Sequence, residues 1–450
     1  MLYWLLKPFV FFSLRVFYKV DVKGLNRIPR NKPVILAPNH SNGFVDPVIL
    51  AMLTPQKVRF FARGDVFKGA FAKWILNQMN VSPMYRMQDG FAELKKNDKS
   101  FEECRNLLTA NKTILIFPEG LCVQERRLRH LKKGLTRIAF QTLESFNYSK
   151  DILVIPVGIN YQAATKFRSK AFIDIGNPIS MKEYEESYKS DKVKAINDFT
   201  KKLEEKILEQ VTNINASHND KLVSNIEEVY THKWLVDKHL NSSKIGNQGI
   251  ASSEIVEMVN VLDEKDPELV ASLKSKIYPY IKLLNENNLR DHLLREENIN
   301  KMNLGTFVLE YIIVYLGVPF YFVGLLLNYP PYFIAEKFAG KKVKKAEFYA
   351  SFRANLSLIF WTLYLFVQLT AVAIIFKSWL LNLVFILIVS LTGFYVLAFY
   401  PVLKKIQGRW KLLRMVRKDR ATIEKMVNLR TEVMTELDRA KKKYLSSVKG

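Results

Sequence analysis

The sequence predicts an α/β layered domain, then an α-helical connector, then transmembrane helices toward the C-terminal end. Three observations predict this order. Short apolar runs alternate with helical patterns over residues 23–180, residues 181–300 are polar with helical periodicity, and residues 301–403 contain three long runs without a charge. The chain has 450 residues, of which 49% are hydrophobic and two are cysteines. That composition excludes a mainly disordered protein, a disulfide scaffold and a thiolate zinc site.

The N-terminal segment combines aromatic side chains with basic residues. Lys7, Arg15 and Lys19 interrupt the apolar sequence, so its uncharged stretches are too short to cross a bilayer comfortably. The segment also lacks a small-residue cleavage site of the kind that follows a removable signal peptide. We therefore expect residues 1–22 to form an interfacial membrane-anchor helix; the alternative is a helix packed against the following domain.

Residues 23–180 show an alternation of strand and helix patterns. We expect strands at residues 33–37, 58–62, 113–117, 152–159 and 171–175. We expect helices at residues 46–53, 66–78, 90–109 and 132–146. Pro156 predicts either an edge strand or a break in the ladder of the fourth strand, because proline cannot donate a backbone hydrogen bond. Residues 181–300 predict a helical connector without recognisable chemistry.

Three stretches of the C-terminal half carry no charge. They hold 25, 23 and 26 residues and lie between Glu310 and Glu336, between Arg353 and Lys377, and between Lys377 and Lys404. A helix needs roughly 20 apolar residues to cross the hydrocarbon core of a bilayer. We therefore expect a membrane region at residues 301–403.

Basic residues flank the last two stretches and predict their orientation. Five basic residues precede the second stretch and five follow the third, whereas Lys377 alone lies between them. The positive-inside rule then predicts a transmembrane hairpin over residues 354–403 with both flanks in the cytoplasm. If the soluble domain lies on the same side, the first stretch must enter and leave there. We expect a re-entrant segment at residues 306–336 that turns at residues 317–319.

The chain carries a formal net charge of +25, and much of this charge lies in its C-terminal segment. Residues 404–450 contain 15 Lys and Arg against 5 Asp and Glu. Such an excess predicts an anionic partner, either lipid or nucleic acid. The segment directly follows a predicted membrane helix and offers only Trp410 and Tyr444 for stacking on bases. We therefore expect a basic cytoplasmic tail that contacts anionic membrane lipids, and no nucleic-acid binding.

His40 differs from the other five histidines in its context. It follows the predicted strand 33–37 closely, and Asp46 comes six positions after it. A histidine at a strand end can act as a general base when a nearby carboxylate orients its ring. The alternative for Asp46 is a helix N-cap, since Asp46-Pro47 before an apolar run is a common helix start. The two roles are compatible.

A second group of residues with possible chemistry follows the strand at 113–117. The sequence Phe117-Pro118-Glu119-Gly120 ends this strand, and a basic stretch that includes Arg126 and Arg127 comes next. Taken alone, this pattern indicates a turn followed by a solvated basic helix face. Guanidinium groups beside a strand-end glycine can also bind a phosphate. Arg86 is the one charge in a separate small apolar turn.

In order and approximate spacing, four places in the chain resemble the glycerol-phosphate and lysophosphatidate acyltransferase family. The blocks of that family are matched by Asn39-His40 with Asp46, by Arg86, by Phe117-Pro118-Glu119-Gly120, and by Ile155-Pro156-Val157. The resemblance covers about residues 20–180. The first and third blocks are specific together, whereas the second and fourth are weak.

Two features depart from the family pattern. Five residues separate His40 from Asp46, where the family usually has four; a similar longer spacing occurs in a branch that includes fungal glycerol-phosphate acyltransferases. Asn42-Gly43 could absorb the extra residue in a turn. Leu121-Cys122 stands where the family often has Thr-Arg after the glycine, which leaves open which downstream arginine meets a phosphate. We expect Cys122 to be a packed small residue.

The resemblance implies a membrane-bound O-acyltransferase that moves a fatty acyl chain from acyl-CoA or acyl carrier protein to 1-acylglycerol 3-phosphate. Glycerol 3-phosphate or another lysolipid is the alternative acceptor. By this resemblance, His40 is the general base, Asp46 holds its ring, Arg86 and Arg126 or Arg127 bind the acceptor phosphate, and Phe117, Pro118, Glu119 and Gly120 shape the substrate site. No metal, cofactor or covalent enzyme intermediate is implied.

The alternative from another class of protein is a non-catalytic membrane scaffold that binds anionic lipids. It explains the net charge and the apolar runs. It gives no reason for the four blocks to occur in this order.

Overall fold

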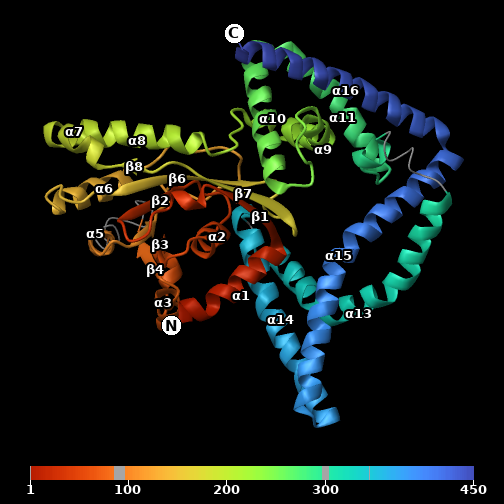
Figure 1. The fold of residues 1–450 in the computed structure, drawn as a ribbon, viewed down its shortest axis with the longest axis horizontal. Coiled ribbons are helices and arrows are strands. Elements are labelled where there is room, and N and C mark those ends of the chain that lie inside the picture. Colours follow the sequence, from red (N-terminus) through yellow and green to blue (C-terminus); the bar gives the residue numbers. More distant parts are fainter. Residues whose placement is uncertain (1, 86–96, 296–303, 344, 450) are drawn as a thin grey trace. The chain divides into compact units, whose positions relative to one another are not determined.

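The computed structural model describes residues 2–85, 97–295, 304–343 and 345–449, which form two compact units. The first unit comprises Met1–Asn215, Ser242–Ser253 and Lys345–Ser351, and it carries the described strands. The second unit comprises Ala216–Asn241, Glu254–Lys344 and Phe352–Gly450, and its described elements are helices (Figure 1).

One sheet organises the first unit. Its strands are β1 (Tyr18–Lys23), β2 (Val34–Pro38), β3 (Val58–Arg63), β4 (Val81–Met84), β5 (Thr113–Leu115), β6 (Leu153–Tyr161), β7 (Ser169–Ile175) and β8 (Ile179–Ser180). Their order is β1-β7-β6-β2-β5-β3-β4, with β8 paired to β6. The α/β class and the five expected strands are confirmed. Residues 18–22, which we expected in the anchor helix, belong instead to β1, because their alternating side chains suit pairing with β7.

The register of the central strands brings two sequence blocks together. β2 pairs in parallel with β5 and with β6, so that Leu36 lies opposite Leu115 on one side and Ile155 on the other. Parallel strands end at the same edge of a sheet. The segments that follow β2 and β5 therefore meet at this edge, as they do at ligand sites of open α/β sheets.

β6 is an interior strand, between β2 and β7. The edge position that Pro156 suggested is therefore wrong, whereas the break in the ladder is present. β7 ends at Ile175 and β8 begins at Ile179, and Pro156 lies opposite the gap between them. Its carbonyl accepts a hydrogen bond from the N–H of Gly176 at 2.8 Å. Because no residue of β7 or β8 pairs with Pro156 in the ladder, the missing proline N–H leaves no acceptor on these strands unsatisfied.

Helices cover the sheet of the first unit (Figure 1). They are α1 (Leu2–Phe17), α2 (Val45–Leu53), α3 (Ala70–Gln78), α5 (Asn97–Thr109), α6 (Gly134–Ser145), α7 (Glu185–Ser190) and α8 (Lys192–Leu208). Short 3-10 turns lie at Leu25–Arg27, Gly64–Phe67 and Lys182–Tyr184. The helices expected at 46–53 and 132–146 are confirmed; the one at 66–78 is a 3-10 turn followed by α3. Of the helix expected at 90–109, α5 forms the end, and residues 90–96 lie outside the described residues.

The first unit extends beyond residue 180, where we expected it to end. α8 buries Phe199, Leu203 and Ile207 in the same hydrophobic core as Ile35 and Ile152 of the sheet region. The apolar face of this amphipathic helix therefore completes the core of the α/β unit. The boundary at residue 180 is too early for this reason.

The second unit is built from long helices. They are α9 (Asp220–Asp237), α10 (Ile245–Lys265), α11 (Pro267–Glu286), α13 (Leu304–Lys342), α14 (Ala346–Phe376), α15 (Trp379–Lys418) and α16 (Arg420–Lys449), with 3-10 turns at Ser217–Asn219 and Asp291–Leu294. α10 and α14 begin in the first unit and continue in the second.

The C-terminal segment is a folded helix and does not form a free tail. α16 packs along α11 and buries Met426, Val433 and Leu437. Charged side chains of α16 pair with other residues of the second unit. Lys276 Nζ lies 2.5 Å from Glu436 Oε2, and Lys443 forms an ion pair with Asp266. The apolar stripe of α16 explains this packing.

Among the described residues, three helices, α13, α14 and α15, are long and apolar enough to cross a membrane. The turn that we expected at residues 317–319 is not formed, since α13 continues through it. Gly317 serves helix packing instead. A Cβ atom there would come within 2.5 Å of the Phe399 ring in α15, and the Tyr395 hydroxyl donates to the Gly317 carbonyl at 3.1 Å.

Pro330 and Pro331 remove two backbone donors from α13. In a helix, their N–H groups would bond the carbonyls of Leu326 and Leu327. Two side chains of α14 replace these donors: the Tyr364 hydroxyl donates to Leu326 O at 3.1 Å, and Gln368 Nε2 donates to Leu327 O at 3.3 Å. Because unpaired carbonyls are costly in apolar surroundings, these contacts allow the prolines to persist within a long apolar helix.

The contacts of α13 with α14 and α15 show that its two ends extend toward the same side of the α14–α15 hairpin. From Asn328 to Glu310, its partners on α15 progress from Val389 to Arg409, away from the turn at Lys377. From Leu326 to Glu336, its partners on α14 progress from Tyr364 to Arg353, again away from that turn. α13 is accordingly curved in Figure 1. Both of its ends point away from the end of the α14–α15 hairpin that carries Lys377.

Candidate active site

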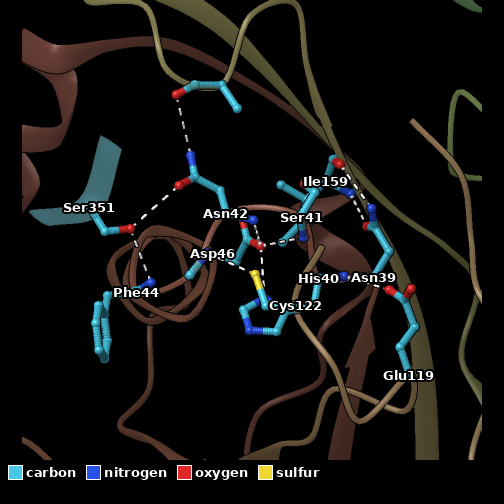
Figure 2. Close-up of polar contacts among 12 residues, drawn as sticks. Asn39, His40, Ser41, Asn42, Phe44, Asp46, Glu119, Cys122, Ile159 and Ser351 are labelled. Atoms are coloured by element: carbon cyan, nitrogen blue, oxygen red, sulfur yellow. Dashed lines mark hydrogen bonds and ion pairs between the residues drawn. The ribbon is translucent and has the colours of Figure 1, made fainter. Parts of the chain in front are cut away.

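The segment after β2 is fixed to the neighbouring strand by an asparagine. Asn39 Oδ1 accepts from the Ile159 N–H at 2.6 Å, and Asn39 Nδ2 donates to the Ile159 carbonyl at 3.1 Å. The side chain thus pairs with β6 as a strand residue would (Figure 2). His40 follows at once and leaves the sheet from a rigid point.

His40 and Asp46 form a direct contact. His40 Nδ1 lies 2.9 Å from Asp46 Oδ2, and because an ionised carboxylate only accepts, the ring nitrogen is the donor. Asp46 is fully buried, whereas the His40 side chain is 17% exposed. A buried carboxylate that receives the Nδ1–H fixes the tautomer in which Nε2 can accept a proton.

Asp46 does not cap α2, although its sequence suggested an N-cap. Phe44 occupies the cap position, and the carboxylate turns back toward the loop. Asp46 Oδ2 accepts from the N–H of Ser41 at 2.9 Å and of Asn42 at 2.7 Å, and Oδ1 accepts from the Tyr161 hydroxyl at 2.7 Å. These three donors and the histidine satisfy a charge that would otherwise be costly to bury.

The longer spacing between His40 and Asp46 is absorbed by a turn, as expected. The N–H groups of Val45 and Asp46 both donate to the Asn42 carbonyl, at 2.9 and 3.1 Å. Gly43 has a φ of 20° at this turn, at the margin of the left-handed region, which favours glycine. The Gly43 N–H points at Cys122 Sγ, 3.1 Å away. Burial raises the pKa of the Cys122 thiol, so this cysteine is a packed neutral residue, as expected.

The block after β5 lies directly against His40. The Phe117 ring stacks on the imidazole, with a centroid distance of 3.9 Å and an interplanar angle of 22°. Glu119 Oε1 accepts from the His40 N–H at 2.7 Å, and Oε2 accepts from the Arg129 N–H at 3.1 Å. Gly120 has a φ of 70°, which a side chain would strain. The structure thus brings the first and third sequence blocks together.

Burial raises the pKa of Glu119 to about 7, despite the two backbone N–H donors that oppose the shift. Because this folded-state pKa lies above the unfolded value near 4.5, the folded protein binds the proton more tightly. The stability from this group is therefore present below pH 4.5 and is lost as pH rises to about 7, a contribution of about 3 kcal/mol. We compare the melting temperatures of wild type and Glu119→Gln. We expect the difference, wild type minus variant, to decrease as the pH is raised from 5 to 7. Parallel melting curves for the two proteins would contradict this expectation.

The predicted phosphate-binding arginines have other contacts. Arg126 Nη2 donates to the Ser252 hydroxyl at 2.9 Å, and Arg127 Nε lies 3.7 Å from Glu125 Oε2. A phosphate-binding role for either one stays a prediction. Arg86 lies outside the described residues, so its expected role is also untested.

Sequence patterns missed Tyr161 as a residue of this site. It lies at the end of β6, and burial, then the charge of Asp46, raise its pKa, so the hydroxyl stays protonated and donates. A tyrosine at the end of an apolar strand is a common core residue, so nothing local marked it. Only the pairing of β6 with β2 reveals its proximity to Asp46.

Comparisons with known proteins concern the same part of the chain. A sequence model described as Acyltransferase matches residues 19–160. A chloroplastic 1-acyl-sn-glycerol-3-phosphate acyltransferase of Brassica napus is 29% identical over 131 residues, which are 29% of this chain and 36% of the relative. Glycerol-3-phosphate O-acyltransferase 1 of Saccharomyces cerevisiae is 26% identical over 251 residues, which are 53% of this chain and 31% of the relative. The chain spans about a third of the length of both relatives.

A solved structure is also similar. The 1-acyl-sn-glycerophosphate acyltransferase PlsC of Thermotoga maritima aligns with a TM-score of 0.32 and 22% sequence identity, over 44% of this chain and 78% of that chain.

Proposed function

We propose that this chain is a membrane-bound O-acyltransferase of the glycerol-phosphate and lysophosphatidate acyltransferase family, because a model described as Acyltransferase matches residues 19–160 and the similar plant and yeast proteins are acyltransferases by name. Its acceptor is 1-acylglycerol 3-phosphate, and its donor is acyl-CoA or acyl carrier protein. The observation that carries the proposal is the 2.9 Å contact between His40 and the buried Asp46, directly beside the Phe117–Gly120 turn.

In the proposed reaction His40 acts as the general base. Its Nε2 takes the proton of the acceptor hydroxyl as that oxygen attacks the thioester carbonyl carbon. The carbon–sulfur bond then breaks, and the imidazolium returns the proton to the departing thiolate. Asp46 holds the ring and stabilises its positive charge during the transfer. No acyl-enzyme intermediate is required.

The acceptor phosphate is proposed to meet arginine side chains. Arg86 and Arg126 or Arg127 supply guanidinium groups suited to bidentate contacts with phosphate oxygens. Glu119 and Gly120 shape the wall beside His40 through the hydrogen bonds of the buried carboxylate. The fatty acyl chain is insoluble in water, which requires the site to work at a membrane.

Glycerol 3-phosphate is the second candidate acceptor. The similarity to the yeast glycerol-3-phosphate acyltransferase extends over 251 residues, against 131 for the plant relative that acts on 1-acylglycerol 3-phosphate by name. The five-residue spacing between His40 and Asp46 also resembles the fungal branch.

An acceptor panel tests the proposed function. The purified full-length protein is given labelled acyl-CoA or acyl carrier protein with glycerol 3-phosphate, 1-acylglycerol 3-phosphate or a lysolipid without a free phosphate. We expect labelled phosphatidate from 1-acylglycerol 3-phosphate, at a rate above that with either other acceptor. A faster reaction with glycerol 3-phosphate would favour the second candidate. No transfer from any donor, with binding to anionic vesicles intact, would favour the scaffold and contradict the enzyme.

We propose that the catalytic unit and both flanks of the membrane region lie on the cytoplasmic side. The curved α13 supports this orientation, because both of its ends point away from Lys377. Basic residues precede α14 and end α15, whereas Lys377 alone lies at the opposite end of the hairpin. A bent helix of this kind enters and leaves on one side, although its turn is not at residues 317–319.

Cysteine labelling in sealed vesicles tests this orientation. We expect Lys282→Cys, Lys342→Cys and Lys418→Cys to react with a membrane-impermeant maleimide from the cytoplasmic side, and Lys377→Cys from the other side. Labelling of residues 282 and 342 from opposite sides would show that α13 crosses the bilayer completely. That result would contradict the proposed topology.

A further inference from the structure

The start of α14 touches the loop that connects His40 to Asp46. Ser351 Oγ accepts from the Phe44 N–H at 3.1 Å and donates to Asn42 Oδ1 at 3.4 Å (Figure 2). Three residues before Ser351 on the same helix, Phe348 faces Phe44 with a ring-centroid distance of 6.0 Å. Residues 345–351 belong to the α/β unit, although α14 itself continues into the helical unit. A candidate membrane helix therefore begins on the loop of the candidate active site.

The contacted loop residues also hold the carboxylate. The Asn42 N–H donates to Asp46 Oδ2. The Asn42 side chain accepts from the Ser351 hydroxyl through Oδ1 and donates to the Tyr18 hydroxyl through Nδ2, at 3.0 Å. Asn42 and Ser351 are both 1% exposed. Because Asn42 is buried, loss of the Ser351 hydroxyl leaves Asn42 Oδ1 without this donor in a place that water does not readily reach, and it also removes the acceptor of the Phe44 N–H.

The loop and α14 approach as closely as a glycine allows. A Cβ atom on Gly43 would lie 2.9 Å from the Glu347 carbonyl oxygen and 2.9 Å from the Phe348 ring. The extra residue between His40 and Asp46 thus forms a turn that fits against the first turns of α14. The longer spacing and the contact with α14 are two parts of one arrangement.

We propose that Ser351 is a positioning residue that ties the start of the membrane helix α14 to the His40–Asp46 pair. The inference rests on the proposed acyl transfer. Ser351 fixes Asn42 and Phe44, Asn42 orients Asp46 through its backbone N–H, and Asp46 orients His40. With the Ser351 contacts in place, the His40 ring is held in the orientation for proton transfer. Without the Ser351 hydroxyl the loop becomes more mobile, and the ring faces the acceptor hydroxyl correctly in a smaller fraction of substrate complexes.

The test compares Ser351→Ala with Ser390→Ala in the full-length protein. Ser390 is a matched control, because its hydroxyl donates to the Ile386 carbonyl of its own helix. We expect Ser351→Ala to lower kcat about 10-fold while KM for both substrates stays within about twofold, and Ser390→Ala to match wild type. Ser351→Cys, which is similar in size and forms weaker hydrogen bonds, should give an intermediate kcat and serves as the probe if Ser351→Ala does not fold.

A double-mutant cycle with Asn42→Ala completes the test. If Ser351 acts through Asn42, the double variant should lose less activity than the product of the two single losses. Independent losses, or a Ser351→Ala enzyme with wild-type kcat, would overturn this inference and leave the proposed function intact. A wild-type protein that transfers no acyl chain in the acceptor panel would instead overturn the proposed function itself.

Discussion

Replacing His40 with alanine is expected to remove nearly all acyl transfer while the protein still folds and reaches the membrane. A general base of this kind contributes about 10²- to 10⁴-fold to the rate. The loop should survive the change, because the contact with Glu119 uses the backbone N–H of residue 40, which alanine retains. The measurement is kcat with labelled acyl-CoA, alongside the melting temperature and the amount of protein in the membrane fraction.

His218→Ala is the control for the loss of a histidine. Its side chain is 62% exposed and pairs with Asp263 in the helical unit, so its removal should leave activity unchanged. If His40→Ala kept more than about a tenth of the wild-type rate, the loss would be too small for a general base. His40 would then have a structural role only.

The fold and the centre of the site could be predicted because both depend on local patterns. Apolar runs of strand length identified β2 and β5, and the polar residues after them identified His40 and Glu119. That the two residues touch follows from the adjacency of β2 and β5, which places both ends at one edge of the sheet. The motifs did not specify that order of strands.

Contacts between distant parts of the chain could not be predicted in the same way. Tyr161 reaches Asp46 across 115 residues and Ser351 reaches Phe44 across 307, and neither has a distinctive local pattern. The course of α13 was hidden for a related reason. Tyr364 and Gln368 of α14 satisfy the carbonyls opposite Pro330 and Pro331, and Gly317 packs against Phe399 of α15 without forming the expected turn. The local sequence of α13 shows neither set of contacts.

Replacing Asp46 with asparagine is expected to cause the second large loss, by about 10²-fold or more in kcat. The amide oxygen can take the place of Oδ2 and still accept from the Ser41 and Asn42 N–H groups, and the Tyr161 hydroxyl can accept from the amide NH2. The loop is therefore expected to fold. What disappears is the negative charge that stabilises the protonated His40 ring during transfer.

Tyr161→Phe separates this charge effect from the packing of the loop. It removes the Tyr161 hydroxyl that donates to Asp46 Oδ1 but keeps the carboxylate beside His40, so we expect less than about a 10-fold loss of kcat, the size of one hydrogen bond. Kinetics of Asp46→Asn and Tyr161→Phe, with melting temperatures for both, distinguish the two roles. If Asp46→Asn retained activity while His40→Ala did not, the charge would be dispensable. Residue 46 would then act through the shape of the loop alone, since the oxygen atom that accepts from the Ser41 and Asn42 N–H groups is present in either variant.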